Sequence, residues 1–123
     1  MGSSRNKVVG ENPVNAKAIE LANIIKESEE YKRYLYYLGK IKARPELYAK
    51  VCAFRKQNFE MQNSDVEENL YDRVIRFRIE NEELRKDALV NDFLRSELTV
   101  CRMMQHVNHI IMDNITLDIE FLN

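Results

Sequence analysis

The chain has 123 residues, of which 32% are charged and 45% hydrophobic, with only three glycines and two prolines. This length and the scarcity of helix breakers predict one all-α domain rather than a sheet protein. The 19 basic and 20 acidic side chains lack the basic excess of a dedicated nucleic-acid binder, and no stretch approaches the roughly 18 apolar residues of a membrane span.

The first third of the chain predicts a disordered lead followed by helix. Residues 1–13 are polar and show no helical period, so we expect them to be a disordered lead before a single helical domain over residues 14–123. Apolar residues then recur at helical spacing from Val14 to Ile41. Ser28 interrupts this stripe and is followed by two glutamates. The segment is therefore either one long helix or two helices with a kink, the second capped by Ser28.

The middle third predicts two further helices. Proline is well tolerated at the first position of a helix, so Arg44-Pro45-Glu46 predicts a new helix, which continues to about Met61. Capping-box pairs within residues 64–68 predict the start of a third helix. Its apolar stripe reaches Leu84 and is interrupted by Asn81. Together with the final helix, these segments predict an antiparallel bundle of about four long helices.

The final helix carries more apolar surface than one core requires. Asp87 is placed to cap it, and its pattern extends from Ala88 to about Ile115. A helix that packs one face on its own domain needs an apolar stripe only about 100° wide. Leaving about 300 Å² of extra apolar surface in water would forgo ~7 kcal/mol, which rivals the stability of a small domain. The sequence therefore predicts a helix that is central to the bundle or shared with another subunit, through an interface of Phe93, Leu94, Leu98, Cys101, Met104 and Ile111.

The C-terminal segment changes its period. Residues 115–121 alternate strictly between apolar and polar side chains, which is the spacing of a strand. Two interpretations remain open. The segment is either a frayed helix end whose apolar residues dock on the body, or an extended arm that can add to a partner's sheet edge.

Residues that could support catalysis are few. His106, His109 and Asp113 share a helical face and could converge on a metal ion, but solvated histidines are the more common finding. No nucleophile or phosphate-binding motif occurs, and Cys52 and Cys101 fit reduced thiols in a cytoplasmic protein. We expect no enzymatic activity, no cofactor, no metal and no small-molecule substrate.

The turn into the second predicted helix is locally basic. Arg44 and Lys50 lie there with other cations and with Tyr48 and Phe54. Aromatic and basic side chains together suit single-stranded RNA, so an RNA-binding accessory subunit is the alternative function. A solvated bend is the competing interpretation, and we expect no direct nucleic-acid binding.

Four segments, taken in order, resemble the YlbF/YmcA family. The first follows that family's opening pattern of Leu-Ala, Ile, then Ser-x-Glu and an aromatic residue. The second is a proline-started helix with a Phe-x-x-x-Gln-like run, the third an acidic-basic helix, and the fourth the start of the last helix. Their positions here are Leu21–Tyr31, Pro45–Asn58, Val66–Leu84 and Asp87–Glu97.

The resemblance implies a small, cytoplasmic, all-helical bacterial regulator. It implies a homo-oligomer that also forms complexes with related family members and with a YaaT-type protein. It further implies roles in competence, sporulation and biofilm development, and in messenger RNA processing through ribonuclease Y. It brings no catalytic residues. Some relatives carry C-terminal cysteines associated with an iron–sulfur complex, and residues 113–123 here contain none.

Overall fold

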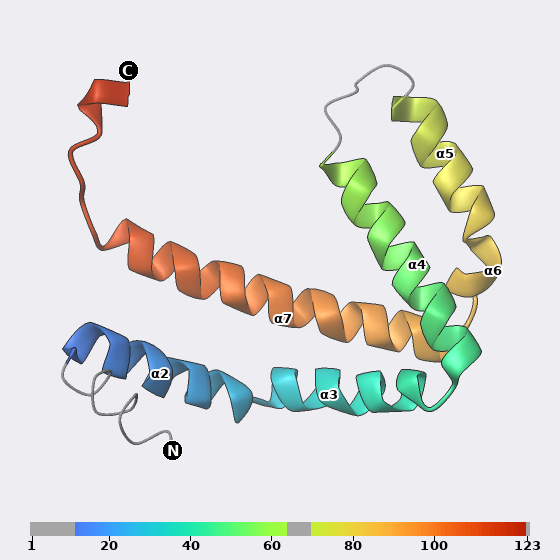
Figure 1. Ribbon diagram of the computed structural model, residues 1–123, viewed down its shortest axis with the longest axis horizontal. Helices are drawn as coiled ribbons and strands as arrows, with labels where there is room; N and C mark the ends of the chain where they lie inside the picture. The colour runs from blue at the N-terminus through green and yellow to red at the C-terminus, as the bar shows by residue number, and fades with distance from the viewer. Residues whose placement is uncertain (1–11, 64–69, 123) are drawn as a thin grey trace.

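The computed structural model describes residues 12–63 and 70–122, and within these residues the protein is helical and contains no strand (Figure 1). The all-α class predicted from the sequence is confirmed. The elements, in chain order, are α2 Pro13–Lys26, α3 Glu29–Lys42, α4 Pro45–Gln62, α5 Leu70–Glu80, α6 Glu82–Arg85, α7 Ala88–Asp113 and the 3-10 turn η1 Glu120–Leu122.

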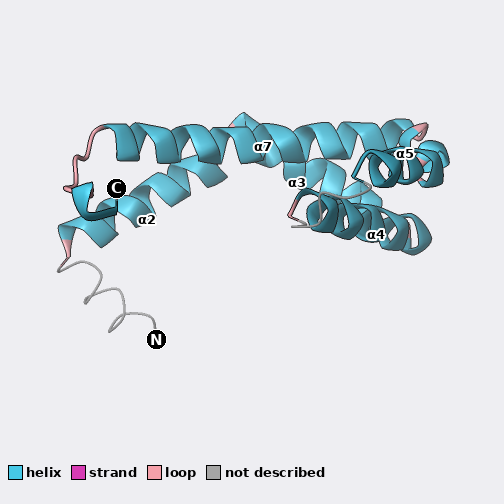
Figure 2. Cartoon of the chain, turned by 90° about the horizontal axis from the view of Figure 1, so that it is seen from above, coloured by secondary structure: helices cyan, strands magenta, loops and turns pink. Residues whose placement is uncertain are grey.

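The helices form two pairs that meet at one end. Figure 1 shows α2 and α3 in line with one another, and α7 lying back alongside them with its chain running the opposite way. Helices α4 and α5 form a second pair, which projects from the end where α3 stops and α7 starts. Figure 2, seen from above, shows α4 and α5 at the same end of α7 as α3. The predicted bundle of about four helices is not confirmed in its details, because the second pair leaves most of α7 uncovered.

Ser28 separates the first two helices. Its hydroxyl accepts a hydrogen bond from the Tyr31 backbone N–H at 3.2 Å and donates one to the Ile25 carbonyl at 2.6 Å. The side chain thus ends α2 and caps α3, and Glu29 and Glu30 in the first turn of α3 suit the helix dipole. Of the two interpretations of residues 14–41, the broken helix is confirmed.

Local capping also fixes the other starts. Helix α2 begins at Pro13, one residue earlier than predicted, because the Asn12 side chain accepts hydrogen bonds from the first-turn N–H groups at 2.9 and 3.3 Å. Helices α4 and α7 begin as predicted, with the Asp87 carboxylate accepting from the Leu89 and Val90 N–H groups. The predicted disordered lead before residue 12 and the capping boxes at residues 64–68 lie outside the described residues.

The third predicted helix is broken. Helix α5 ends at Glu80 and the short α6 starts at Glu82, so the prediction of one helix through Leu84 was wrong. The amide side chain of Asn81 donates to the Phe77 carbonyl at 2.8 Å, in competition with the regular backbone bond. Asparagine competes with helical hydrogen bonding in this way, which explains the break at this position.

The buried core is small and lies where α3, α4 and α7 meet. Ile41, Val51, Val90 and Phe93 form it. The ring of Tyr34 stacks on that of Phe93, with the centroids 5.8 Å apart. A polar clamp closes the same corner, because the Arg55 guanidinium lies 2.6 Å from the Glu97 carboxylate and 5.4 Å from the Phe93 ring. Helix α4 is thereby tied to α7 near the start of α7.

The C-terminal segment leaves the body of the protein. Helix α7 ends at Asp113, and residues 115–119 are not helical. The large apolar side chains of this segment are exposed, Phe121 by 80%. The interpretation of a frayed helix end docked on the body was therefore wrong. The segment has the open form expected of an arm, while its addition to a partner's sheet stays a prediction.

Candidate functional site

The two halves of α7 differ in how they are covered. Its first third contributes Val90, Phe93 and Ser96 to the interior, but no residue from Glu97 to Asp113 is buried. Figures 1 and 2 both place α2 alongside this later part of α7. Helix α2 covers it only partly, since α2 itself contains no buried residue. The later part of α7 is therefore an open surface rather than part of the core.

The predicted interface residues fall into two groups. Phe93 is fully buried within its own chain, so its place in an intersubunit interface was a wrong prediction: the α3–α4 corner already covers it. Leu94 is half-buried against the same core. The other four retain exposed side chains and lie together on the open part of α7: Leu98, Cys101, Met104 and Ile111.

The open apolar surface is wider than the sequence indicated. Ile110 and Met112 are also exposed on α7, and Ile19 and Ile24 are exposed on α2. Ile19 and Ile24 lie outside the apolar stripe that starts at Val14. Their position outside the stripe is the sequence signal that could have identified them as exposed apolar residues. We define the open face as the exposed apolar side chains of α2 and of α7 beyond Ser96.

This open face suits packing against protein rather than chemistry. Exposed apolar side chains that gather on one part of a protein commonly mark an interaction site. Three methionines, Met103, Met104 and Met112, lie on this part of α7. Their flexible side chains can fill differently shaped partner surfaces. The arrangement thus brings together exposed apolar and flexible side chains.

The candidate metal ligands do not form a centre. His106, His109 and Asp113 are all exposed on α7. Within residues 12–63 and 70–122, no group of three histidine, cysteine or acidic side chains is placed to hold a metal ion. The two cysteines are both free, and Cys101 lies exposed on the open face.

The turn between α3 and α4, which holds Arg44, carries charges of both signs together with its neighbours. Arg44 lies 3.7 Å from the Asp87 carboxylate, and the pocket of about 480 Å³ that holds Arg44 and Lys50 is also lined by Glu80 and Glu83. A phosphate backbone would meet acidic as well as basic groups there. The structure thus brings the predicted cations together, but not as a uniformly positive surface.

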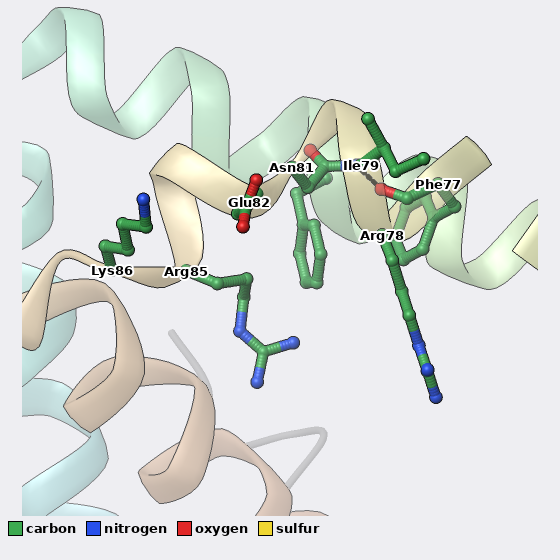
Figure 3. A pocket seen from close by; sticks show the side chains of 8 residues that line it. Phe77, Arg78, Ile79, Asn81, Glu82, Arg85 and Lys86 are labelled. Carbon is green, nitrogen blue, oxygen red and sulfur yellow. Dashed lines mark hydrogen bonds between the residues drawn. The ribbon is translucent and has the colours of Figure 1, made fainter. Parts of the chain in front are cut away.

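A second pocket, which the sequence did not single out, lies between α4, α5 and α6. It measures about 480 Å³ and combines an apolar wall with three cations and one carboxylate, from Arg78, Arg85, Lys86 and Glu82 (Figure 3). The rings of Phe54 and Phe77 stack with centroids 5.0 Å apart. The sequence pattern treated both rings as core. The lining comes from both sides of the break at Asn81, so the prediction of one continuous helix did not identify it.

The ionisable side chain that stacks on the core ring of Phe93 has a perturbed pKa. Burial raises the pKa of the Tyr34 hydroxyl above its ordinary value of 10.0, and the neighbouring Glu97 carboxylate raises the pKa further. Tyr34 packs on Phe93, so the raised pKa of Tyr34 reflects the packing of the core where α3, α4 and α7 meet.

Across the described ranges, no helix combines the length and hydropathy needed to cross a bilayer.

Comparison with known proteins yields one match. The model of the family described as control of competence regulator ComK, YlbF/YmcA matches residues 14–116. That range runs from the start of α2 to just beyond α7, so it includes the open face and the α4–α6 pocket. Neither the curated proteins nor the solved structures provide a match. Because the family model covers most of its length, the chain belongs to the YlbF/YmcA family of regulators of competence.

Proposed function

We propose that this protein is a non-enzymatic, cytoplasmic regulator that acts by self-association and by binding other proteins through its open face. The observation that carries the proposal is the exposure of apolar side chains along α7: Leu98, Met104 and Ile111 remain about half exposed. A second copy of the chain could bury them, because obligate interfaces are large and apolar at their centre.

The same surface suits more than one partner. The methionines of α7 can repack against differently shaped helices, which is a property of promiscuous binding surfaces. We therefore propose mixed complexes with related family members and with a YaaT-type protein, besides the homo-oligomer. Through such complexes the protein would contribute to competence, sporulation, biofilm development and ribonuclease Y-linked messenger RNA processing.

Light scattering on the full chain tests self-association. A monomer has a mass of 14.6 kDa. We expect a mass of at least twice this value, and a return to the monomer mass in the Leu98→Glu variant. For the mixed complexes, the tagged chain is co-expressed with a related family member and a YaaT-type protein. Both should co-purify with the wild type and be lost from Leu98→Glu, and a strictly monomeric wild type that retains neither would refute the proposal.

The alternative function, an RNA-binding accessory subunit, has less support. It relies on Arg44 and Lys50, and Arg44 is already close to the Asp87 carboxylate. Filter binding of single-stranded RNA at two salt concentrations distinguishes the alternatives, because phosphate contacts make affinity fall steeply with salt. Salt-dependent retention that disappears in the Arg44→Glu, Lys50→Glu variant would favour the RNA-binding function.

A further inference from the structure

Two features of the molecule have no role in the open face: the exposed C-terminal segment and the pocket between α4, α5 and α6. We call residues 115–122 the tail and the space lined by Phe54, Phe77, Arg78 and Arg85 the arginine pocket. We propose that the tail of one copy docks in the arginine pocket of a second copy. This inference rests on the proposed self-association and adds to it a second contact, separate from the open face.

The arginine pocket has an apolar wall and a cationic rim. Phe77 and Ile79 supply accessible apolar surface beside the buried Phe54 ring, and Arg78 and Arg85 supply positive charge. Glu82 adds one carboxylate to the lining, so with Lys86 the cations outnumber it three to one. Figure 3 shows the Arg78 and Arg85 side chains extending to the same side of the α5–α6 break. A volume of about 480 Å³ lies in the range of pockets that enclose ligands of several side chains' size. The pocket thus suits an acidic peptide with an aromatic or aliphatic anchor.

The two arginines are available for a carboxylate. Arg85 donates to the Asn91 side chain at 3.3 Å, and its guanidinium lies 5.7 Å from the Phe54 ring centroid. In the part of the chain that the structure describes, neither Arg78 nor Arg85 forms an ion pair with an acidic side chain. A guanidinium that stacks on a ring still presents its N–H groups for bidentate pairing with a carboxylate.

The tail has the complementary chemistry. Asp118 and Glu120 alternate with the exposed apolar residues Ile119, Phe121 and Leu122. A local turn shapes its end, because the Asp118 carboxylate accepts from the Glu120 N–H at 3.1 Å and the Ile119 carbonyl accepts from the Leu122 N–H at 2.9 Å. The tail therefore presents an aromatic anchor preceded by two carboxylates, which matches the wall and the net positive rim of the arginine pocket.

The geometry excludes docking within one chain. The arginine pocket lies beside the start of α7, whereas the tail leaves from its far end (Figure 1). Helix α7 has 26 residues, so it is about 39 Å long at 1.5 Å per residue. Eight residues separate Asp113 from Phe121, and fully extended they span at most ~29 Å. The tail cannot reach its own pocket, so only the pocket of another copy is accessible to it.

Photo-crosslinking of the full chain tests this contact. Phe121 is replaced by the photoreactive analogue p-benzoylphenylalanine, and nitrogen-15-labelled and unlabelled chains are mixed before irradiation. We expect mass spectrometry to find crosslinks between labelled and unlabelled chains that join position 121 to residues 77–82. The same analogue at Tyr71 is the matched control, since Tyr71 is an aromatic residue with 76% exposure and lies outside the tail.

Charge reversal shows whether the contact is specific. Arg78→Glu with Arg85→Glu should lower the crosslink yield at least tenfold, and Asp118→Lys with Glu120→Lys should do the same. Combining all four substitutions in one chain should restore the yield, because the charges are again complementary. Circular dichroism confirms that each variant keeps its helices. A yield that is unchanged by either reversal, or not restored by the combination, would overturn the inference.

The outcomes separate this contact from the proposed function. If light scattering shows an oligomer but position 121 crosslinks only to α2 or α7 or to nothing, docking in the arginine pocket is refuted and self-association stands. If the wild type is a monomer at every concentration, the proposed function fails and this inference fails with it. Intermolecular crosslinks to residues 77–82 that obey the charge reversals support both.

Discussion

Replacing Leu98 with glutamate is the sharpest perturbation of the open face. Leu98 lies on α7 beyond the last buried residue, and 48% of its side chain is exposed in the single chain. Glutamate and leucine have similar helix propensities, and changes at exposed sites usually alter stability by about 0.5 kcal/mol or less. We therefore expect the Leu98→Glu chain to keep its fold and to lose only its ability to associate.

The exposed fraction sets the size of the effect. Burying a whole leucine side chain contributes roughly 1.5–3 kcal/mol, so burying the remaining half contributes about 0.7–1.4 kcal/mol per copy. A symmetric dimer contains the residue twice, so about 1.5–3 kcal/mol of association free energy is lost. At 1.4 kcal/mol for each factor of ten, dimerisation should weaken roughly tenfold to a hundredfold. A carboxylate forced into an apolar interface adds to this loss, so the range is a minimum.

Sedimentation velocity over a concentration series measures the change, with circular dichroism as the check on folding. Thr99→Glu is the matched control, because it places the same charge on the next residue, turned by about 100° around the helix, where the side chain is also exposed. Thr99→Glu should associate like the wild type. Phe93→Ala should behave differently from both, since emptying a fully buried site typically costs about 3–5 kcal/mol of folding stability.

Two results would refute this reasoning. One is a Leu98→Glu chain that associates as tightly as the wild type, which would show that the open face is not the interface. The other is a Leu98→Glu chain that loses its helices as Phe93→Ala does, which would show that Leu98 belongs to the core of the chain.

Three further predictions concern the fold itself. Ser28→Ala removes the cap of α3 and should lower the free energy of unfolding by about 1 kcal/mol in thermal melts. A double-mutant cycle of Arg55→Met and Glu97→Gln in urea should give a coupling energy of about 1 kcal/mol, kept small because both side chains are partly solvated. Because the pKa of Tyr34 is raised in the folded state, the folded chain holds this proton more tightly than the unfolded chain, and stability should fall as pH rises through and above 10. Tyr34→Phe should show a shallower loss in alkaline urea titrations.

The sequence predicted well what local interactions decide. The helix starts at Pro45 and Ala88 and the break at Ser28 all follow from side chains that bond or preset the backbone within four residues. Such signals are complete in the sequence, because both partners of each interaction are neighbours in the chain. The same reasoning placed the end of α7 within two residues of Asp113.

What depends on distant segments was predicted less well. Phe93 and Leu98 are both apolar residues of α7, and the sequence assigned both to an interface. They differ because α3 and α4 pack on α7 at Phe93, whereas no described helix covers Leu98. This difference is visible only in how the helices pack. The arginine pocket was missed for a related reason, because its lining comes from both sides of the break at Asn81, whereas Phe54 is buried as its apolar stripe predicts.

The position of the core also links folding to association. Helix α2 has 14 residues and none of them is buried, and isolated helices of this length are marginal in water. Helix α2 packs only slightly on the rest of the chain, and the later part of α7 is itself uncovered in a single chain. A partner that covered exposed apolar side chains of both helices would add the contacts that α2 lacks. We therefore expect association to stabilise this end of the molecule, whereas the corner around Phe93 is already buried within the chain. A partner at the open face would then also complete the folding of the end that it contacts.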